Sequence, residues 1–366
     1  MKTEEEWMAR AILLAQKGEG RTNPNPLVGA VLVKEGRLIG EGFHEKRGEA
    51  HAERNALAAC TEDPRGATMY VTLEPCCHYG RTPPCTEAII GAGISRVVVG
   101  SMDPNPKVAG KGIGQLRKAG IQVETGIQGA ACEALNPIFF HYMKKGMPFV
   151  AVKYAMTADG KIATRTGASQ WITGEEARGH VHRLRNRYRA IMVGSETVLR
   201  DDPLLTCRIP GGRNPVRVIC DRRLRIPLDS RICRTAGEVE TIVASSGPDP
   251  EKRRILEQMG VTVLDLPCAE DKLDLHALMT VLAGREVDGV LVEGGSRLLA
   301  SVLEERLAQK LYCYLAPKLF GGLEAPSPLG GLGVSLPHQA VRLGAPRIQQ
   351  FSGGDLLLEY DIKEDA

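Results

Sequence analysis

A histidine, a glutamate and two cysteines in the first quarter of the chain could do chemistry together. His51 and Glu53 are two positions apart, and Cys76 and Cys85 follow downstream. One imidazole and two thiolates are ligands that Zn²⁺ prefers, and three protein ligands leave the fourth position of a catalytic zinc for water. Zinc lowers the pKa of that water towards neutrality, and a neighbouring carboxylate can move its protons. We therefore assign His51, Cys76 and Cys85 to a catalytic zinc, and Glu53 to proton transfer.

This arrangement favours hydrolytic deamination. Zinc-dependent base deaminases share the pattern H-x-E followed by P-C-x-x-C, in which the glutamate is not a zinc ligand. Pro75-Cys76 fits the pattern, but eight residues separate Cys76 from Cys85 instead of two. The intervening residues must form a loop that returns the second sulfur to the metal.

A structural zinc site is the alternative for the same residues. Cys77 or His78 would then complete a closed shell of four ligands. Any single cysteine or histidine is also commonly a buried residue without a catalytic role. Glu53 favours the catalytic site, because a purely structural zinc does not need a neighbouring acid.

The composition is typical of a soluble globular protein. The chain has 366 residues, of which 43% are hydrophobic and 25% are charged. This length exceeds the size at which one hydrophobic core keeps growing, so we expect two domains. No run approaches the roughly 18 apolar residues of a membrane span, and the acidic first residues are not typical of a secretory signal. Because ten scattered cysteines indicate reduced thiols, we expect a cytoplasmic location and no membrane contact.

Charge and aromatic content favour a small-molecule substrate. The net charge is +3, acidic and basic residues are nearly balanced in both halves, and aromatic residues make up 4% of the chain. Nucleic-acid-binding proteins usually carry a basic block and aromatic stacking platforms. We therefore expect a nucleotide-like molecule and no nucleic-acid partner. A nucleic-acid deaminase with an appended domain is the alternative, and its binding would weaken steeply with salt.

Short apolar strands alternate with helices in the first half, which predicts an α/β sandwich. Expected strands are 30–33, 38–43, 67–73, 96–100 and 121–124, and expected helices are 7–16, 49–59, 86–90 and 111–119. Pro75 ends one strand, and we expect Cys76 to begin the next helix, where the helix dipole favours a thiolate. The segment 110–114 is glycine-rich but follows prolines, and we interpret its start as a turn. A helix and a connector over 133–147 place the domain boundary near Met147.

The alternation restarts in the second half. Expected strands are 149–155, 190–193, 216–221 and 289–293, and expected helices are 174–188 and 297–306. Gly294-Gly295-Ser296 lies between a strand and a helix, where backbone N–H groups can approach a phosphate. An ordinary tight turn is the alternative for these residues. A Rossmann or P-loop domain is not indicated, since its glycine motif does not follow the expected strands.

Longer segments of the chain resemble a known family. In the first half these are residues 23–29, 51–53, 74–78 and 81–85, and in the second half they are Lys153 and residues 159–163, 169–173, 194–198, 201–206 and 293–295. In this order they resemble the bifunctional riboflavin biosynthesis deaminase/reductases over nearly the whole chain. The gap of eight residues between the two cysteines is that family's own pattern.

The resemblance implies both a fold and an activity. The implied fold is α/β, with a cytidine-deaminase-like α/β/α sandwich at residues 1–147 and a dihydrofolate-reductase-like α/β domain at residues 148–366. The first domain would use Zn²⁺ to deaminate a diaminopyrimidinone that carries a ribosylamino phosphate. The second would use NADPH to reduce the ribosyl group to a ribityl chain. The family also implies a homo-oligomer, either a dimer or a tetramer. A non-catalytic zinc module that senses a nucleotide is the alternative, and it would bind NADPH without turnover.

The resemblance further implies site residues. Besides Glu53, catalytic positions are Lys153, Asp201 and Glu293, and the sequence does not decide which of these three donates the proton. Substrate-binding positions are Asn23, His44, His78, Arg81 and Asp103 in the first domain, and Ser169, Arg185, Asp201, Leu205, Arg208 and Glu293 in the second. Arg185 and Arg208 are expected to grip the substrate phosphate. Cofactor-binding positions are Ala155, Trp171, Thr197, Arg223, Gly294, Gly295 and Ser296. Arg222, Arg223 and Arg225 are candidates for the 2′-phosphate of NADPH, with a solvent-facing loop as the alternative.

Overall fold

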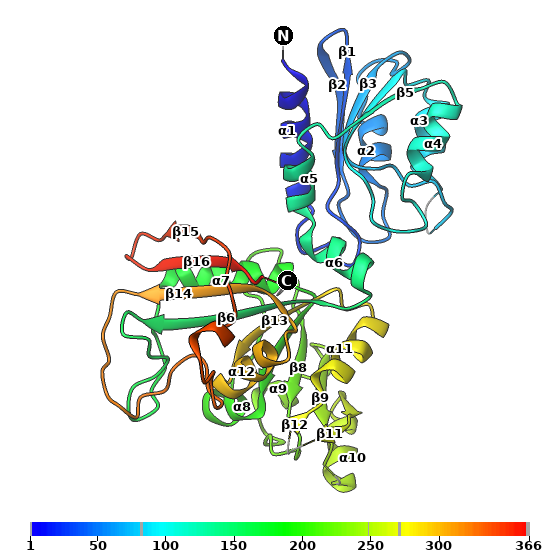
Figure 1. Cartoon of the computed structure of the whole chain (residues 1–366). Coiled ribbons are helices and arrows are strands. Elements are labelled where there is room, and N and C mark those ends of the chain that lie inside the picture. The colour runs from blue at the N-terminus through cyan, green and yellow to red at the C-terminus, as the bar shows by residue number, and fades with distance from the viewer. Residues whose placement is uncertain (1, 81–82, 248, 270–271, 364–366) are drawn as a thin grey trace. The chain divides into compact units, whose positions relative to one another are not determined.

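The chain folds into two compact α/β units. The computed structural model describes residues 2–80, 83–247, 249–269 and 272–363. Contacts divide the chain into Met1–Met147 and Pro148–Ala366, and each unit is described here by itself (Figure 1). Among the described residues, no helix combines the length and the hydropathy that a membrane crossing requires.

The first unit is built on a mixed sheet with the strand order β2-β1-β3-β4-β5. Its strands are β1 (Gly29–Lys34), β2 (Arg37–Phe43), β3 (Thr68–Leu73), β4 (Arg96–Ser101) and β5 (Gln122–Thr125). β1 pairs antiparallel with β2 and with β3, whereas β3, β4 and β5 run parallel. β3 and β4 are rich in apolar residues, and all but their first residues are buried, because both faces of the sheet are covered.

Helices cover both faces of this sheet (Figure 1). One face carries α1 (Glu4–Gln16) and α5 (Gly129–Leu135), and the other carries α2 (Ala52–Ala58), α3 (Cys85–Gly91) and α4 (Lys111–Lys118). Trp7, Met8 and Val31 belong to the core under α1, and Leu32 and Met69 belong to the core on the opposite side. The expected α/β/α sandwich is therefore present.

One local prediction for this unit is wrong. Cys76 does not begin a helix; it lies in the loop after β3, and α3 begins at Cys85. Pro83 and Pro84 follow in this loop, and prolines disrupt the interior of a helix, so a helix from Cys76 could not continue through them. The glycine-rich segment starts in a turn as expected, with Gly110 as a left-handed N-cap, and α4 begins at Lys111. The helix and connector expected over 133–147 are present as α6 (Pro137–Lys145), which directly follows α5, and the residues after it.

The second unit is built on a long sheet with the order β10-β9-β8-β7-β13-β6-β14-β16-β15. Its strands are β6 (Phe149–Thr157), β7 (Ala190–Gly194), β8 (Val216–Cys220), β9 (Thr241–Ser245), β10 (Val261–Asp265), β13 (Gly289–Gly294), β14 (Ala308–Ala316), β15 (Arg347–Gln350) and β16 (Leu356–Asp361). From β10 to β14 the neighbours pair in parallel, and β16 and β15 add an antiparallel edge. A small separate hairpin joins β11 (Cys268–Ala269) to β12 (Lys272–Leu273).

The helices of this unit follow the strands. They are α7 (Glu175–Arg187), α8 (Ser195–Asp201), α9 (Arg231–Arg234), α10 (Pro250–Gln258), α11 (Leu275–Gly284) and α12 (Ser296–Glu304), and a 3₁₀ turn lies at Pro337–Gln339. β13 lies between β7 and β6, and both β7 and β13 run directly into helices. Ligands of parallel sheets bind at the carboxyl ends of the strands. The three central strands therefore direct residues such as Lys153, Thr197 and Glu293 to one edge of the sheet.

Candidate active sites

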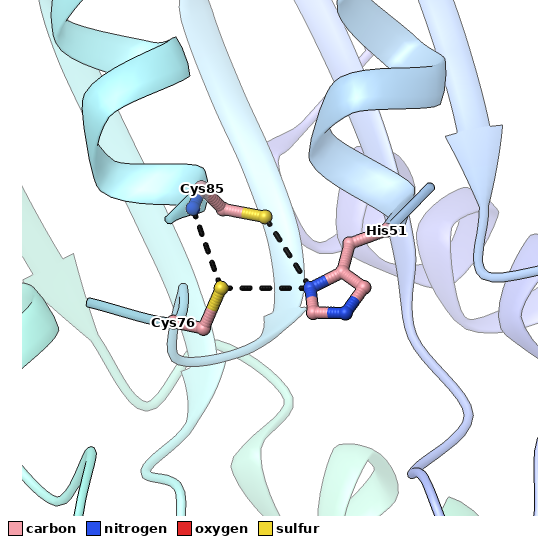
Figure 2. Close-up of side chains that lie close together, drawn as sticks. All are labelled: His51, Cys76 and Cys85. Carbon is pink, nitrogen blue, oxygen red and sulfur yellow. Dashed lines mark hydrogen bonds between the residues drawn. The ribbon is translucent and has the colours of Figure 1, made fainter. Parts of the chain in front are cut away.

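The first candidate site brings together His51, Cys76 and Cys85. His51 is the N-cap of α2, Cys76 lies in the loop after β3, and Cys85 is the first residue of α3. His51 Nδ1 is 3.5 Å from Cys76 Sγ and 3.5 Å from Cys85 Sγ, and all three donor atoms lie within 4.8 Å of one another (Figure 2). Ligands of a tetrahedral zinc, at about 2.0–2.3 Å from the metal, lie roughly 3.5–3.8 Å apart. This donor set and its spacing fit Zn²⁺.

The start of α3 stabilises the Cys76 thiolate although Cys76 is not part of that helix. The backbone N–H of Cys85 donates a hydrogen bond to Cys76 Sγ at 3.3 Å. The Cys85 thiol, and then His51 and this N–H, lower the pKa of the Cys76 thiol to about 4, against the opposing effect of burial. A thiolate is the form that binds a metal. The hydrogen bond from the start of α3 therefore favours the form of Cys76 that binds a metal.

The residues that would close a structural zinc site lie elsewhere. Cys77 Sγ is 3.8 Å from the carbonyl oxygen of Lys107, and His78 is exposed on the loop. Within the described ranges, the ligand cluster consists of His51, Cys76 and Cys85. Three ligands leave a fourth position open, as a catalytic zinc requires.

Glu53 is a buried acid next to this cluster. It lies in the first turn of α2, its exposed fraction is 3%, and its Oε2 has no hydrogen-bond partner among the described residues. Burial is the main cause that raises the pKa of this carboxyl above its ordinary value. Buried side-chain oxygens without a partner are uncommon in proteins, and a catalytic role is one explanation for them.

Two of the predicted substrate positions are buried in this unit. The His44 ring lies edge-on to the His51 ring with 5.2 Å between centroids, and its Nδ1 is 3.1 Å from the Ala50 carbonyl oxygen. Burial lowers the pKa of His44. Asp103 is also buried, its Oδ1 accepts the N–H of Asn105 at 2.8 Å, and burial raises its pKa to about 6.

The other predicted substrate positions are less well defined. Asn23 is half-buried on the segment before β1, and His78 is exposed. Arg81 lies outside the described residues. The structure therefore brings His44 against His51, a predicted zinc ligand.

Glu74 is a residue that the sequence interpretation missed. Its exposed fraction is 3%, its Oε2 accepts the N–H groups of Asp103 (3.4 Å) and Gly110 (3.0 Å), and its Oε1 accepts the N–H of Ile113 (3.2 Å). It therefore caps α4 from a distance and fixes the backbone of Asp103. A Cβ on Gly112 would lie 2.1 Å from the Pro75 carbonyl oxygen, so only glycine allows this approach. The available signal was an acid at the end of a buried strand, directly before Pro75-Cys76.

The second candidate site, in the other unit, centres on Lys153, Arg185 and Glu293. Arg185 Nε donates to Glu293 Oε1 at 2.7 Å, and Arg185 Nη2 donates to Oε2 at 2.9 Å. Lys153 Nζ lies 4.0 Å from Oε2. The Arg185 fork is therefore engaged with Glu293.

Burial and charge act in opposite directions at this site. Burial raises the pKa of Glu293, but Arg185 and Lys153 outweigh it, so the pKa lies below the ordinary value of 4.5. Burial lowers the pKa of Lys153 below 10.5, Glu293 opposes this effect, and Arg185 adds to it. Glu293 is therefore ionised, and Lys153 gives up its proton more readily than an ordinary lysine.

A hydrogen bond connects α7 to the loop after α8 beside this site. Asp201 Oδ1 accepts a long hydrogen bond from Ser169 Oγ at 3.5 Å, and Leu205 is buried with a φ of 53°. Arg185 Nη1 donates to the Thr206 carbonyl oxygen at 3.0 Å. Ser169 is thus linked to Asp201 by one hydrogen bond. Arg185 is linked by another to the segment that follows Leu205.

Two further residues hold this loop and were missed from the sequence. The Arg208 N–H donates to His182 Nδ1 at 3.3 Å, and burial lowers the pKa of His182 to about 4. Arg217 is fully buried in β8 and donates to the carbonyl oxygen of Leu204 (3.3 Å) and to Thr241 Oγ1 (2.6 Å). An arginine inside the apolar run of β8 was the available signal for Arg217.

The predicted cofactor positions meet at the ends of β7 and β13. Gly295 has a φ of 82° and is the N-cap of α12, without a side-chain cap. A Cβ on Gly294 would lie 3.2 Å from Thr197 Oγ1, so the glycine turn and α8 touch. Uncapped N–H groups at a glycine turn suit a phosphate, and these residues therefore fit a dinucleotide.

The remaining cofactor positions lie on several different elements. Ala155 lies on β6, and Ser296 begins α12. The Trp171 ring is 59% exposed and carries the Arg178 guanidinium 4.6 Å above its centroid. Arg223 is exposed in the loop after β8, and Arg225 from the same loop donates to Ser195 Oγ at 2.9 Å. The structure thus connects Arg225 directly to the start of α8.

Comparison with protein families accounts for both units. Residues 1–101 match the model of the cytidine and deoxycytidylate deaminase zinc-binding region, and residues 148–356 match the model of the RibD C-terminal domain. The first match contains the three candidate zinc ligands, and the second contains the site at Lys153. The expected deaminase-like first domain and reductase-like second domain are confirmed.

Individual relatives match over nearly the whole length. The riboflavin biosynthesis protein RibD of Actinobacillus pleuropneumoniae is 51% identical over 360 residues, which cover 98% of this chain and 96% of the relative. A solved structure of Acinetobacter baumannii RibD has 39% identity and a TM-score of 0.89, with 98% of this chain and 99% of that chain covered. A deaminase/reductase structure from Thermotoga maritima has 41% identity and a TM-score of 0.84, with 98% of each chain covered. The chain therefore belongs to the RibD family of bifunctional riboflavin biosynthesis enzymes, which join a deaminase to a reductase.

Proposed function

We propose that residues 1–147 deaminate 2,5-diamino-6-ribosylamino-4(3H)-pyrimidinone 5′-phosphate and that residues 148–366 reduce the ribosyl group of the resulting 5-amino-6-(5-phosphoribosylamino)uracil. The proposal depends above all on the triangle of His51, Cys76 and Cys85 beside the buried Glu53. The related Thermotoga maritima protein is described as a diaminohydroxyphosphoribosylaminopyrimidine deaminase and 5-amino-6-(5-phosphoribosylamino)uracil reductase, which supports these substrates.

In the deaminase domain, His51, Cys76 and Cys85 would hold one Zn²⁺. Bound there, the metal supplies Lewis acidity that makes water nucleophilic near neutral pH. Glu53 takes a proton from the attacking water and delivers one to the amino group, which leaves as ammonia. Its Oε2, without a partner among the described residues, is available for both transfers.

Substrate contacts in this domain are proposed for Asn23, His44, His78, Arg81 and Asp103. Because burial lowers its pKa, His44 is a neutral imidazole that can donate or accept a hydrogen bond. Glu74 fixes the backbone of Asp103 and so orients that residue.

In the reductase domain, NADPH supplies the hydride when it is bound. One proton must accompany the hydride, and we propose Lys153 as its donor because Arg185 keeps Glu293 ionised. Ser169, Arg185, Asp201, Leu205, Arg208 and Glu293 are the proposed substrate contacts. Ala155, Trp171, Thr197, Arg223, Gly294, Gly295 and Ser296 are the proposed cofactor contacts. The enzyme is proposed to act as a homo-oligomer in the cytoplasm, on small molecules alone.

The test of this function is a product analysis. Purified enzyme is supplied with the diaminopyrimidinone phosphate and NADPH, and the products are identified by mass spectrometry. We expect ammonia and a ribitylaminouracil phosphate, with one NADPH oxidised per product. A substrate that is recovered intact would contradict the proposal, and NADPH binding without oxidation would favour the sensor alternative.

A further inference from the structure

Lys153 lies in a buried site that holds more positive than negative charge. Its side chain is 14% exposed, and the side chains of Arg185 and Glu293 are 14% and 6% exposed. Both oxygens of Glu293 accept hydrogen bonds from Arg185, at 2.7 and 2.9 Å, whereas Lys153 Nζ is 4.0 Å from the nearer oxygen. One carboxylate thus faces two cations, and the arginine has the better geometry. The Lys153 ammonium needs another source of stabilisation.

The ring of Tyr314 supplies a second partner for Lys153. Lys153 Nζ lies over this ring, 5.5 Å from its centroid, and Tyr314 is fully buried. β6 and β14 pair in parallel, and Tyr312 is the partner of Lys153 in this register. Tyr314 is two residues further along β14, so its side chain lies on the same face of the sheet as that of Tyr312. An ammonium within about 6 Å of an aromatic ring is attracted to the ring face, and more strongly where water is excluded.

The Tyr314 ring is held in a fixed orientation. Its hydroxyl is 2.6 Å from His180 Nδ1, on α7. The Phe351 ring is stacked on it, with centroids 6.4 Å apart and an interplanar angle of 11°. Phe351 is itself buried. The ring therefore cannot swing away from Lys153 without breaking both contacts.

We infer that Tyr314 is a positioning residue that keeps Lys153 protonated through its ring face, and that His180 and Phe351 hold this ring in place. The inference rests on the reductase role proposed for Lys153. Three groups face the ammonium from the surrounding elements: Glu293 from β13, Arg185 from α7 and Tyr314 from β14. Burial and Arg185 lower the pKa of Lys153, and Glu293 and the ring face oppose them.

The test measures the protonation of Lys153 directly, in the full chain and without substrate or NADPH. Lysines are labelled with ¹³C at Cε, the Lys153 signal is assigned from its loss in Lys153→Gln, and its shift is followed against pH. In Tyr314→Leu the midpoint should fall by about one pH unit, the size expected from a desolvated cation–π contact. In Tyr314→Phe, which keeps the ring and its stacking on Phe351 but loses the hydrogen bond to His180, the midpoint should fall clearly less than in Tyr314→Leu.

A matched variant separates this effect from a loss of packing. Tyr312 is a second buried tyrosine on the same strand and face, but its ring packs edge-on against Tyr188, 6.4 Å away. Tyr312→Leu should leave the Lys153 midpoint unchanged. An unchanged midpoint in Tyr314→Leu, or an equal fall in Tyr312→Leu, would overturn the inference.

Fluorinated phenylalanines at position 314 provide a second route if Tyr314→Leu does not fold. They keep the shape of the ring while each fluorine weakens its negative face, so the Lys153 midpoint should fall stepwise with the number of fluorines. A midpoint that is independent of fluorine number would overturn the inference. The role proposed for Lys153 in the reductase has its own test. It would be contradicted if Lys153→Gln still oxidised NADPH at the parent rate.

Discussion

Arg185 holds both carboxylate oxygens of Glu293, with Nε 2.7 Å from Oε1 and Nη2 2.9 Å from Oε2. The remaining nitrogen of the guanidinium, Nη1, donates to the Thr206 carbonyl oxygen. One arginine on α7 thus connects the end of β13 to the loop that follows α8. The two hydrogen bonds from Arg185 keep Glu293 ionised. They also fix the position of the carboxylate that lies next to Lys153.

Replacement of Arg185 by lysine should impair the reductase alone. A lysine keeps the charge but loses the planar fork, so the two bonds to Glu293 and the bond to Thr206 cannot all persist. Hydrogen bonds to charged groups are worth about 1.5–3 kcal/mol, so we expect kcat/KM for the aminouracil to fall roughly 10- to 100-fold. Ammonia release should not change. Arg183→Lys, an exposed position on the same helix, is the matched control, and an equal loss in both variants would contradict the role given to Arg185.

The reductase rate should decline as the pH rises. The proposed donor must be protonated, burial lowers the pKa of Lys153 below 10.5, and the ammonium fraction is lost above that pKa. The alkaline limb of kcat should therefore have its midpoint below 10.5. It is measured by NADPH absorbance with saturating aminouracil, and Lys153→Arg should remove the limb together with most of the activity. A rate that rises steadily up to pH 10.5 would contradict Lys153 as the donor.

Glu74→Gln should weaken the deaminase while the zinc stays bound. The glutamine amide presents N–H groups to backbone N–H groups, so the bonds to Gly110 and Ile113 cannot both remain. We expect α4 and the Asp103 backbone to shift, and KM for the diaminopyrimidinone to rise on the order of tenfold. Zinc content and NADPH oxidation serve as internal controls. Glu87→Gln, an exposed acid on α3, should have no effect, and an unchanged KM in Glu74→Gln would refute the positioning role.

Removal of one zinc ligand should separate the two activities. Cys85→Ser should lose zinc and ammonia release, because a serine hydroxyl is a poor ligand for this metal. Oxidation of NADPH by the aminouracil should persist, since that site lies in the other unit. The control is Cys77→Ser, whose sulfur contacts Lys107 instead. Loss of zinc from Cys77→Ser would favour the structural four-ligand site.

Much of the fold follows from local patterns in the sequence. β3 and β4 are rich in apolar residues because helices cover both faces of the sheet, and this enrichment is visible without a structure. The ligand types at His51, Cys76 and Cys85 likewise predict a metal site from chemistry alone. α8 was missed because Gly194-Ser195-Glu196-Thr197 has no apolar periodicity that would predict a helix.

The contacts that hold the site residues in place could not be predicted from the sequence, because they join segments that lie far apart in the chain. The three N–H groups that Glu74 accepts belong to residues 29, 36 and 39 positions later. Tyr314 meets Lys153 only through the register of β14 on β6. No local pattern encodes such pairings, since they depend on strand order and on the lengths of the connections. Residue types at the sites were therefore predictable, whereas the residues that hold them in place were not.

The most direct test of the account is Glu53→Gln assayed for ammonia and for NADPH in the same reaction. We predict that zinc stays bound, that ammonia release from the diaminopyrimidinone falls by roughly 10²- to 10⁴-fold, and that NADPH consumption falls with it. Addition of the aminouracil should restore NADPH consumption in full. Unchanged ammonia release, or oxidation of NADPH by the undeaminated compound at an equal rate, would contradict the central claim that Glu53 drives a deamination that must precede the reduction.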